Sequence, residues 1–224
     1  MVTEQRPRRR GRPTKAEAPA PDDDVLAAAL RAFATHGYAG VSVRTLSRDL
    51  GVSHNLLHQR FGSKTAIWRA AVDWGFGGLV SRLEAADQEH AEPLERLRSF
   101  IRAFVKVSAS RPELLRIMDG ESTQPSERLA YLCATYILPM ASRLRPPYEQ
   151  LLAAGQIRPI PPETIYYMIT SGGAALYANN AMTTQLFGQL PRTESDIDRH
   201  ADAAADLLIG GLALPAHFSP NPMR

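Results

Sequence analysis

Residues 41–64 read VSVRTLSRDLGVSHNLLHQRFGSK, and the interpretation of the whole chain starts from this stretch. A run compatible with a short helix extends from Ser42 to Leu50 and meets Gly51. A second run begins after Ser53, whose hydroxyl can accept hydrogen bonds from the backbone N–H groups two and three residues further on. Two short helices joined by a tight turn are the helix-turn-helix pattern.

The apolar residues of this stretch recur at helical spacing or lie in the turn, so we expect them to meet in one small core. They are Val43, Leu46, Leu50, Val52, Leu57 and Phe61. Short or planar side chains with hydrogen-bond donors and acceptors cover the opposite face of the second helix: His54, Asn55, His58 and Gln59. Side chains of this kind read base edges when the N-terminal part of a helix enters the major groove of DNA.

The longer run GYAGVSVRTLSRDLGVSHNLLHQRFGSKTAIWRAA resembles the DNA-binding domain of the TetR family of bacterial transcriptional repressors. The shared features follow the family's order: an apolar helix ending in Gly-Tyr, a Ser-Val-Arg start, a Gly-Val-Ser turn and a Phe-x-Ser-Lys opening of the fourth helix. The resemblance covers about residues 24–75. Asn55 to His58 stand where the family usually has Gly-Thr-Leu-Tyr, and Val41 replaces a usual Thr. The family's phosphate contacts from Thr and Tyr are therefore not carried over.

The resemblance implies two further DNA contacts. Arg44 matches an arginine that the family often places on the operator, and Lys64 matches the lysine with which it holds a phosphate. Ser63 is placed to cap the helix that Lys64 opens, and a helix N-terminus with one ammonium group binds anions well. The full set of expected DNA contacts in this region is Ser42, Arg44, Ser53, His54, Asn55, Leu56, His58, Gln59 and Lys64.

Two alternatives stay open for these residues. Arg44 could form an ion pair on a solvated surface instead of contacting DNA. His54 and His58 are four residues apart and could be metal ligands, but no Glu lies between them and no third ligand lies nearby in the sequence. DNA contact or simple exposure is therefore the preferred interpretation of the two histidines.

Length and composition predict a globular protein with a buried core, because the chain has 224 residues and a hydrophobic fraction of 44%. Its one cysteine, Cys133, excludes an intrachain disulfide. No apolar run is long enough to span a membrane, and the N-terminus lacks the apolar segment of a signal peptide. We therefore expect a cytoplasmic protein with no membrane partner.

Positive charge is concentrated at the N-terminus, although the formal net charge is only +3. Residues 1–15 carry six basic side chains and one acidic side chain. Residues 1–22 have too little apolar content to fold, so we expect a disordered basic arm. Its arginines either read the minor groove, as in the AT-hook segments that Arg-Gly-Arg-Pro resembles, or bind phosphates only. The arm residues expected on DNA are Arg8, Arg9, Arg10 and Arg12.

The whole sequence predicts an all-α protein of about nine helices. A three-helix helix-turn-helix domain is expected at 23–70, a helical ligand-binding and dimerisation domain at 71–214, and a flexible tail at 215–224. Gly75, Gly77 and Gly78 predict a bend or break in the fourth helix. Pro93, Pro112 and Ser126 begin later helices, the last of which is interrupted near Pro139 and closed at Pro146-Pro147.

Two long C-terminal helices are expected, from Pro162 to about Leu186 and from Ser195 to Leu214. Both carry many small residues, among them Ala174, Ala201, Ala204 and Ala205, and small residues permit close packing of helices. In the TetR family such a pair forms a four-helix dimer interface, so the resemblance implies a homodimer. The alternative is that these faces pack within one chain.

The resemblance also implies a ligand cavity walled by the fourth to eighth helices. An aromatic and methionine-rich lining suits a flat, mostly apolar small molecule. The candidate lining residues are Trp68, Phe100, Phe104, Met118, Tyr131, Tyr136, Met140 and Tyr166, with Asn179 and Asn180 as polar contacts. No cofactor and no metal are expected.

These features favour a ligand-responsive transcriptional repressor that binds a palindromic DNA operator as a homodimer and is released by its effector. A second hypothesis is a constitutive, nucleoid-type DNA binder whose basic arm supplies most of the affinity. An enzyme is the third, and it is disfavoured because the sequence contains no phosphate loop, metal-ligand cluster or nucleophile elbow.

Overall fold

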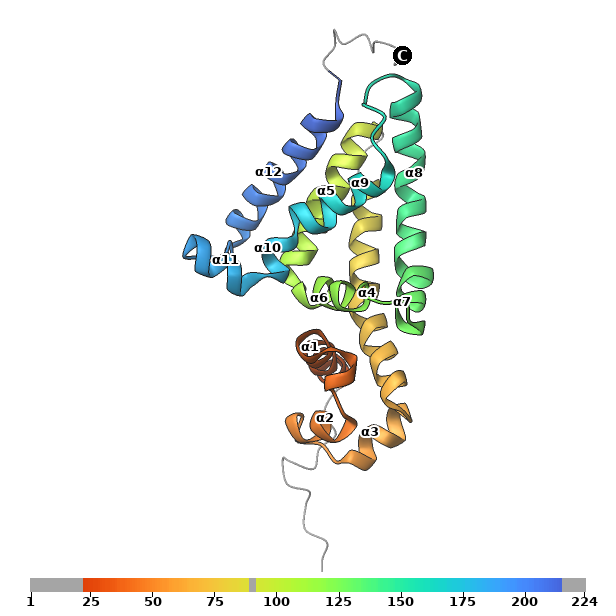
Figure 1. The fold of residues 1–224 in the computed structure, drawn as a ribbon, viewed down its shortest axis with the longest axis vertical. Coiled ribbons are helices and arrows are strands. Elements are labelled where there is room, and N and C mark those ends of the chain that lie inside the picture. The colour runs from red at the N-terminus through yellow and green to blue at the C-terminus, as the bar shows by residue number, and fades with distance from the viewer. Residues whose placement is uncertain (1–21, 89–91, 215–224) are drawn as a thin grey trace, which may run out of the picture.

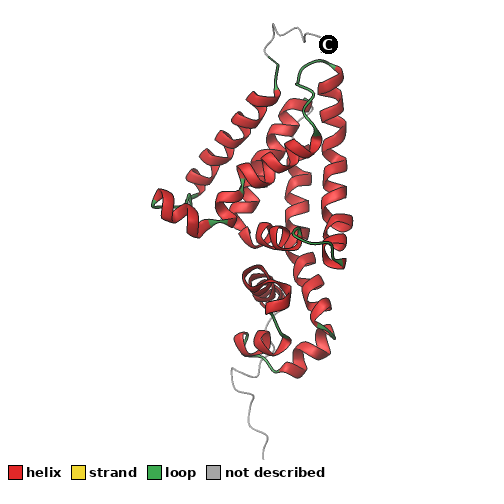
Figure 2. Cartoon of the chain, viewed as in Figure 1, coloured by secondary structure: helices red, strands yellow, loops and turns green. Residues whose placement is uncertain are grey.

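The computed structural model describes residues 22–88 and 92–214. The arm residues Arg8, Arg9, Arg10 and Arg12 and the tail from 215 onward lie outside the described residues. Helices and the loops between them make up the described part, which contains no β-strand (Figure 2). A single antiparallel β-bridge within it joins Ile157 to Ala213. The prediction of an all-α fold is confirmed.

Three helices form the N-terminal unit: α1 (Asp22–Gly40), α2 (Val43–Asp49) and α3 (His54–Phe61). Gly37 interrupts α1 with a φ of +67°, at the position where the sequence predicts its end. Ser53 caps α3 by accepting from the backbone N–H three residues on, as predicted, and Ser42 caps α2 in the same way. Leu46 and Leu57 are buried, and the other four apolar residues of the expected core pack against them.

Helix α4 (Lys64–Gln88) connects this unit to the C-terminal domain as one continuous ribbon (Figure 1). Of the bend or break predicted at its glycines, the break is therefore absent. Gly75 is a packing residue, because a Cβ added there would lie 2.7 Å from Leu114 Cδ2 and 3.0 Å from Leu30 Cδ2. The missing side chain lets α1, α4 and α6 meet at one point. The domain boundary expected at 70/71 falls inside α4.

Four further elements build the centre of the C-terminal domain: α5 (Pro93–Ser110), α6 (Pro112–Glu121), α7 (Glu127–Leu132) and α8 (Leu138–Ala153). A π-helical segment, η1 (Cys133–Ile137), joins α7 to α8 just before Pro139, where an interruption is expected. The predicted helix end at Pro146-Pro147 is wrong, since both prolines lie inside α8. Buried Pro147 and Leu151 hold this part of the helix in place despite the two missing N–H donors.

The chain ends with α9 (Pro162–Tyr167), the π-helical segment η2 (Met168–Gly173), α10 (Ala175–Ala178), α11 (Asn180–Phe187) and α12 (Glu194–Leu212). The single helix expected from Pro162 to Leu186 is thus divided at Ala174 and Asn179. Two glycines weaken the helix before Ala174, and the Asn179 amide donates to the Ala175 carbonyl at 3.1 Å, which favours a local turn. When contiguous segments are joined, the described chain has eleven helical units, two more than the nine expected.

Helix α12 lies antiparallel along α5, and three ion pairs join the two helices at intervals of four residues (Figure 1). The pairs are Arg98 with Asp206, Arg102 with Asp202 and Lys106 with Asp198. The small residues Ala201, Ala204 and Ala205 are buried within the chain. These alanines do not line a dimer interface, because the packing of α12 on α5 already covers them.

Alanine at Gly75 and at Gly78 should have opposite effects on stability. Gly78 has no neighbour within 4 Å of an added Cβ, so Gly78→Ala should raise the free energy of unfolding by about 1 kcal/mol through helix propensity. Gly75→Ala gains the same propensity but displaces Leu114 and Leu30, at a cost of about 1–3 kcal/mol. Urea denaturation of both variants measures the difference. Equal stabilisation by the two substitutions would show that the three-helix junction does not require glycine.

Candidate nucleic-acid interface and ligand cavity

The expected base-reading side chains lie on one exposed face of α3. His54, Asn55, His58 and Gln59 are all exposed, while Leu57 on the opposite side is fully buried. The rings of His54 and His58 stack with their centroids 6.4 Å apart. Leu56 is half-buried beside this face. The helix is fixed by the Ser53 cap at its start and by Gly62, with a φ of +79°, at its end. A rigid helix therefore presents an imidazole-and-amide surface to solvent.

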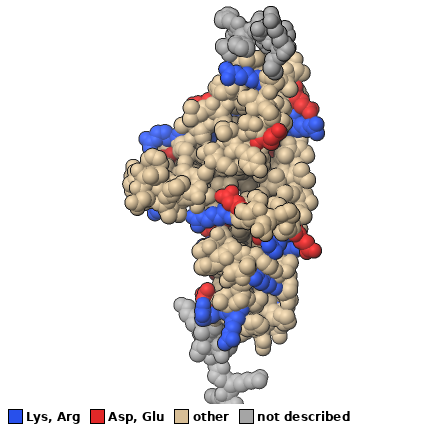
Figure 3. All heavy atoms as spheres, in the orientation of Figure 1, with Lys and Arg blue, Asp and Glu red and all other residues tan. Residues whose placement is uncertain are grey.

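The first helix of the motif adds a cation to this surface. Arg44 is exposed and forms no ion pair within the described residues, so the alternative of a solvated surface pair is not observed there. The Ser42 hydroxyl accepts from the Thr45 N–H at 3.0 Å, and Thr45 in turn accepts from the Ser42 N–H at 3.1 Å. Figure 3 shows basic side chains at the lower end of the molecule, over the helix-turn-helix unit.

Lys64 lies at the N-terminus of α4, where Ser63 accepts from the Ala66 N–H at 3.1 Å. Its ammonium nitrogen is 4.3 Å from the centroid of the Tyr38 ring. The Tyr38 hydroxyl lies 2.7 Å from the Thr65 hydroxyl. The Tyr38 ring therefore holds Lys64, the residue expected to contact a phosphate, at the edge of the unit.

A metal site at the two histidines gains no support from the geometry. Within residues 22–88 and 92–214, no group of three or more His, Cys, Asp or Glu side chains is placed to hold a metal ion. In the same ranges, no helix combines the length and apolar character needed to cross a membrane.

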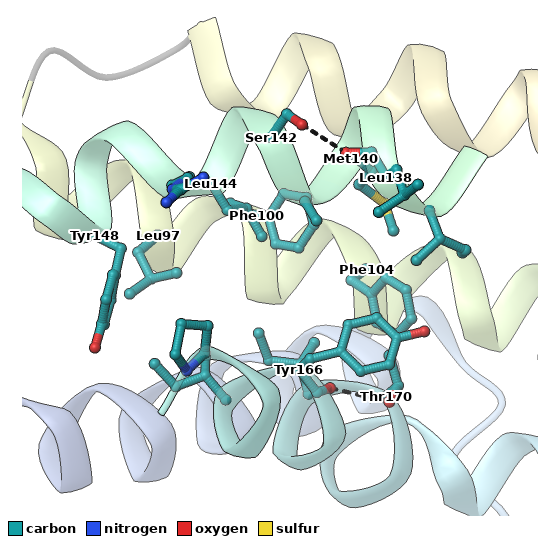
Figure 4. Close-up of a pocket in the computed structure, with 16 residues that line it drawn as sticks. Leu97, Phe100, Phe104, Leu138, Met140, Ser142, Leu144, Tyr148, Tyr166 and Thr170 are labelled. Carbon is teal, nitrogen blue, oxygen red and sulfur yellow. Dashed lines mark hydrogen bonds between the residues drawn. The ribbon is translucent and has the colours of Figure 1, made fainter. Parts of the chain in front are cut away.

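A cavity of about 390 Å³ lies between α5, α8 and α9–η2 (Figure 4). Leu97, Phe100 and Phe104 project into it from α5, and Met140 and Leu144 project from α8. Its polar groups are mostly engaged elsewhere. Ser142 and Thr170 donate to carbonyls of their own helices, and Arg145 pairs with Glu149. This first chamber thus suits an apolar ligand.

A second chamber of about 230 Å³ shares part of its wall with the first. The shared residues are Phe104, Ile137, Met140, Tyr166 and Thr170. The second chamber is more polar, because Asp119 of α6, Ser122 just after that helix and Arg111 just before it line the chamber. Burial raises the pKa of the Asp119 carboxyl above its usual range. The two chambers together place an apolar space beside a more polar one.

Five of the expected ligand residues line these chambers: Phe100, Phe104, Met118, Met140 and Tyr166. Tyr136 lines a small adjoining void of about 60 Å³. Three others lie elsewhere. Trp68 is buried and lines a crevice between the helix-turn-helix unit and the C-terminal domain. The Tyr131 ring contacts Trp68, with 6.2 Å between the ring centroids. Asn179 is exposed, and its side-chain amide donates a hydrogen bond to the Ala175 carbonyl. Helical spacing alone did not show which side of each helix meets the cavity.

Tyr131 and Tyr136 share one acceptor on α4. Their hydroxyls donate to Asp73 Oδ1 at 2.6 and 2.5 Å. Burial, and then the hydrogen bond to Asp73, raise the pKa of Tyr136 far above its usual value, so this phenol stays protonated. The bond from Tyr131 ties α4 to α7, and the bond from Tyr136 ties α4 to η1, whose last residue, Ile137, lines the cavity. Sequence reasoning missed Asp73, since a single acidic residue on a helix carries no distinguishing pattern.

Sequence reasoning also missed most of the cavity lining. Leu97, Leu144, Tyr148, Ile165 and Ile169 line the first chamber beside the predicted aromatic and methionine residues. Aliphatic residues at helical spacing look the same whether they face a cavity or a packed core. Their contribution is visible only once α5, α8 and α9 are placed together.

Comparison with known proteins identifies both parts of the chain. Residues 25–71 match the family model described as "Bacterial regulatory proteins, tetR family", and residues 93–208 match "Tetracyclin repressor-like, C-terminal domain". The second match alone covers more than half of the chain.

Individual relatives are distant. The nucleoid occlusion factor SlmA of Vibrio atlanticus (strain LGP32) is 28% identical over 96 residues, which are 42% of this chain and 49% of that protein, so the chain spans about half the length of this curated relative. The HTH-type transcriptional regulator BetI of Rhizobium meliloti (strain 1021) is 28% identical over 188 residues, covering 80% of this chain and 88% of that protein.

Among solved structures, AibR in complex with isovaleryl coenzyme A and operator DNA has the same fold. It aligns with a TM-score of 0.67 and 20% sequence identity, covering 84% of this chain and 97% of AibR. The helix-turn-helix unit, the helical C-terminal domain and the two family matches lead to one assignment: this chain is a member of the TetR family of bacterial transcriptional regulators.

Proposed function

We propose that this protein is a ligand-responsive transcriptional repressor, which binds a palindromic DNA operator as a homodimer and is released by a small, mostly apolar effector. One observation carries the proposal. The chain that presents the exposed base-reading face of α3 also contains an apolar cavity, and α6 both lines the second chamber of that cavity and packs on α1.

The DNA side of the proposal rests on residue chemistry. Asn55 and Gln59 carry amides that can donate and accept toward base edges, and the two imidazoles add further donors and acceptors. Arg44 and Lys64 would hold phosphates on either side. In a two-fold symmetric dimer the α3 helices would lie about one DNA turn apart, near 34 Å, and would therefore read a palindrome.

Effector action would pass through α6. Met118 and Asp119 near the end of α6 line the second chamber, while Leu114 of the same helix packs at the junction with Gly75 of α4 and Leu30 of α1. A ligand that displaces α6 would therefore move both helices that carry the DNA-binding unit. This route does not require α4 to bend or break at its glycines. AibR, whose structure holds both isovaleryl coenzyme A and operator DNA, supports the pairing of the two sites in one fold.

The dimer would use the outer faces of α11 and α12. Large apolar side chains are exposed there, with Leu207 at 78%, Phe187 at 74% and Leu186 at 66%. Figure 3 shows the projecting region around α11 largely free of charged side chains on the face in view. Exposed glycines at 210 and 211 would let a second helix approach α12 closely. Apolar patches of this kind usually mark protein interfaces.

A constitutive DNA binder is the second candidate, because the chain is 28% identical over 96 residues to SlmA of Vibrio atlanticus (strain LGP32), a nucleoid occlusion factor. That function predicts similar affinity for any duplex, with a steep salt dependence that is lost when residues 1–15 are deleted. If the protein is a repressor, the full-length chain should instead strongly prefer one duplex sequence over others at moderate salt.

Selection of bound fragments from random duplex DNA should yield one palindromic sequence. Asn55→Ala and His58→Ala should then reduce the preference for that duplex over a scrambled one by about 1–3 kcal/mol each, since they remove base contacts. Arg44→Ala is the matched control and should weaken binding to both duplexes alike. Fluorescence anisotropy at fixed salt measures all three variants. A selection that returns no shared sequence would reject the repressor and favour the constitutive binder.

Filling the cavity should abolish effector response without affecting DNA binding. A compound that raises the thermal midpoint of the protein can be found by screening apolar small molecules. Ile165→Trp would occupy the first chamber and should remove that shift while operator affinity stays unchanged. In the unmodified protein, saturating operator should weaken compound binding by the same factor as the compound weakens operator binding, typically about 5–150-fold. If saturating operator left the affinity of the protein for the compound unchanged, the proposed release of DNA by the effector would be rejected.

A charge on the outer face of α12 should separate the dimer. Leu207→Glu places a carboxylate at the centre of the proposed interface, where burying it without a partner is costly. Sedimentation equilibrium should show a monomer, and operator affinity should fall because two half-sites are no longer bound together. Leu152→Glu, on α8 and 37% exposed, is the control and should leave the oligomeric state unchanged. A dimer that persists in Leu207→Glu would place the interface elsewhere.

A further inference from the structure

The Tyr38 ring contacts one cation from each domain. Lys64 Nζ lies 4.3 Å from its centroid and belongs to the first turn of α4, in the DNA-binding unit. Arg128 Cζ lies 4.0 Å from the same centroid and belongs to α7, in the C-terminal domain. Cations within about 6 Å of an aromatic ring are attracted by its electron-rich face. Through non-covalent contacts, Tyr38 therefore connects Lys64, the residue expected to bind a phosphate, to Arg128 of the C-terminal domain.

Arg128 is itself fixed by the corner between α6 and α7, residues 121–126. Its Nε donates to Glu121 Oε1 at 2.8 Å, and the Ser126 hydroxyl donates to the other oxygen of the same carboxylate at 3.3 Å. The Glu121 side chain is only 10% exposed, so this pair is shielded more than a surface ion pair. The position of Arg128 is thus set by the end of α6.

The α6–α7 corner also borders the ligand cavity. Ser122 and Thr123 line the second chamber, and Thr123 lines in addition a crevice of about 430 Å³ between the domains. Tyr38, Glu121 and Arg128 line that crevice from its other sides. A continuous series of contacts therefore runs from the second chamber through the corner and Arg128 to the Tyr38 ring and Lys64.

We propose that Tyr38 is a positioning residue through which the α6–α7 corner controls Lys64. With Arg128 on the ring, Tyr38 stays in place and holds the ammonium group of Lys64 where it can meet a phosphate. When the corner moves, Arg128 leaves the ring, Tyr38 loses its support and Lys64 becomes free to adopt other rotamers. The proposal rests on the proposed function for the identity of the phosphate and of the ligand, but the contacts can be tested without either.

The contact series can be tested in the full chain without DNA. The sequence has only three lysines, Lys15, Lys64 and Lys106, so ¹³C-dimethylation of the lysines gives few NMR signals. The Lys64 methyl signal should be shifted by the Tyr38 ring current, and Tyr38→Leu should abolish the shift. Tyr38→Phe keeps the ring and should preserve it. Arg128→Gln should reduce the shift, although Arg128 touches Lys64 only through the ring. An unchanged Lys64 signal in Arg128→Gln would overturn the proposal.

Operator affinity supplies the second readout. Arg128→Gln should weaken binding to the selected duplex by about 2–5-fold, the size expected for an exposed cation–π contact. Arg82→Gln removes the same charge from the distant half of α4, where the guanidinium donates to the Ser110 hydroxyl at 3.4 Å, and should have no comparable effect. In a Lys64→Gln background, Arg128→Gln should cost nothing further. Equal losses in the two backgrounds would show that Arg128 acts independently of Lys64 and would overturn the proposal.

The two readouts keep the proposals distinguishable. If the protein bound no duplex with preference, the proposed function would fail, while the Lys64 NMR signal would still decide whether Arg128 positions the lysine through Tyr38.

Discussion

The close approach of three helices at Gly75 is the contact on which the arrangement of the two domains depends. No side chain separates α4 from Leu114 of α6 and Leu30 of α1 at this point, so the DNA-binding unit packs directly against the C-terminal domain. A displacement of α6 should therefore shift α1 and α4 as well, because close-packed interiors transmit strain. The glycine that would ordinarily weaken a helix here stabilises the contact between domains.

Helix α5 has two distinct faces that join the cavity to the outer surface. Leu97, Phe100 and Phe104 line the first chamber, while Arg98, Arg102 and Lys106 form the ladder of ion pairs with α12. The four-residue spacing of both charge series fixes the register of α12, since a slip would set cations between carboxylates. The same helix therefore shapes the ligand space and orients the apolar face that we assign to the dimer.

Both π-helical segments lie in the walls of the cavity. Segment η1 places Tyr136 toward Asp73 of α4 and continues into Ile137, and η2 carries Ile169 and Thr170 into the chambers. Segments of this type are frequent at functional sites, because an extra residue in a helical turn redirects side chains. Here the hydrogen bond from Tyr136 to Asp73 connects α4 to the cavity wall, in addition to the packing of Gly75 against Leu114 of α6.

The sequence by itself determined the local structure. Five helix starts could be located in the sequence, at Ser42, Ser53, Ser63, Pro93 and Pro112. The helical spacing of apolar residues, among them Leu46 and Leu57, distinguished the core from the exposed face of α3. These features depend on residues close together in the chain, where capping and periodicity act. The sequence also predicted Phe100, Phe104, Met118, Met140 and Tyr166 as ligand residues, and they line the chambers.

Only the tertiary structure decided what the ambiguous residues do. Gly75 could be a hinge or a packing site, and the positions of Leu114 and Leu30 made it a packing site. Ala201, Ala204 and Ala205 could face a second chain or α5, and the charge ladder turned them toward α5. Tyr38, Asp73 and Arg128 act through partners more than 25 residues away. Spacing within one helix holds no information about such partners, because they meet only when separate helices pack.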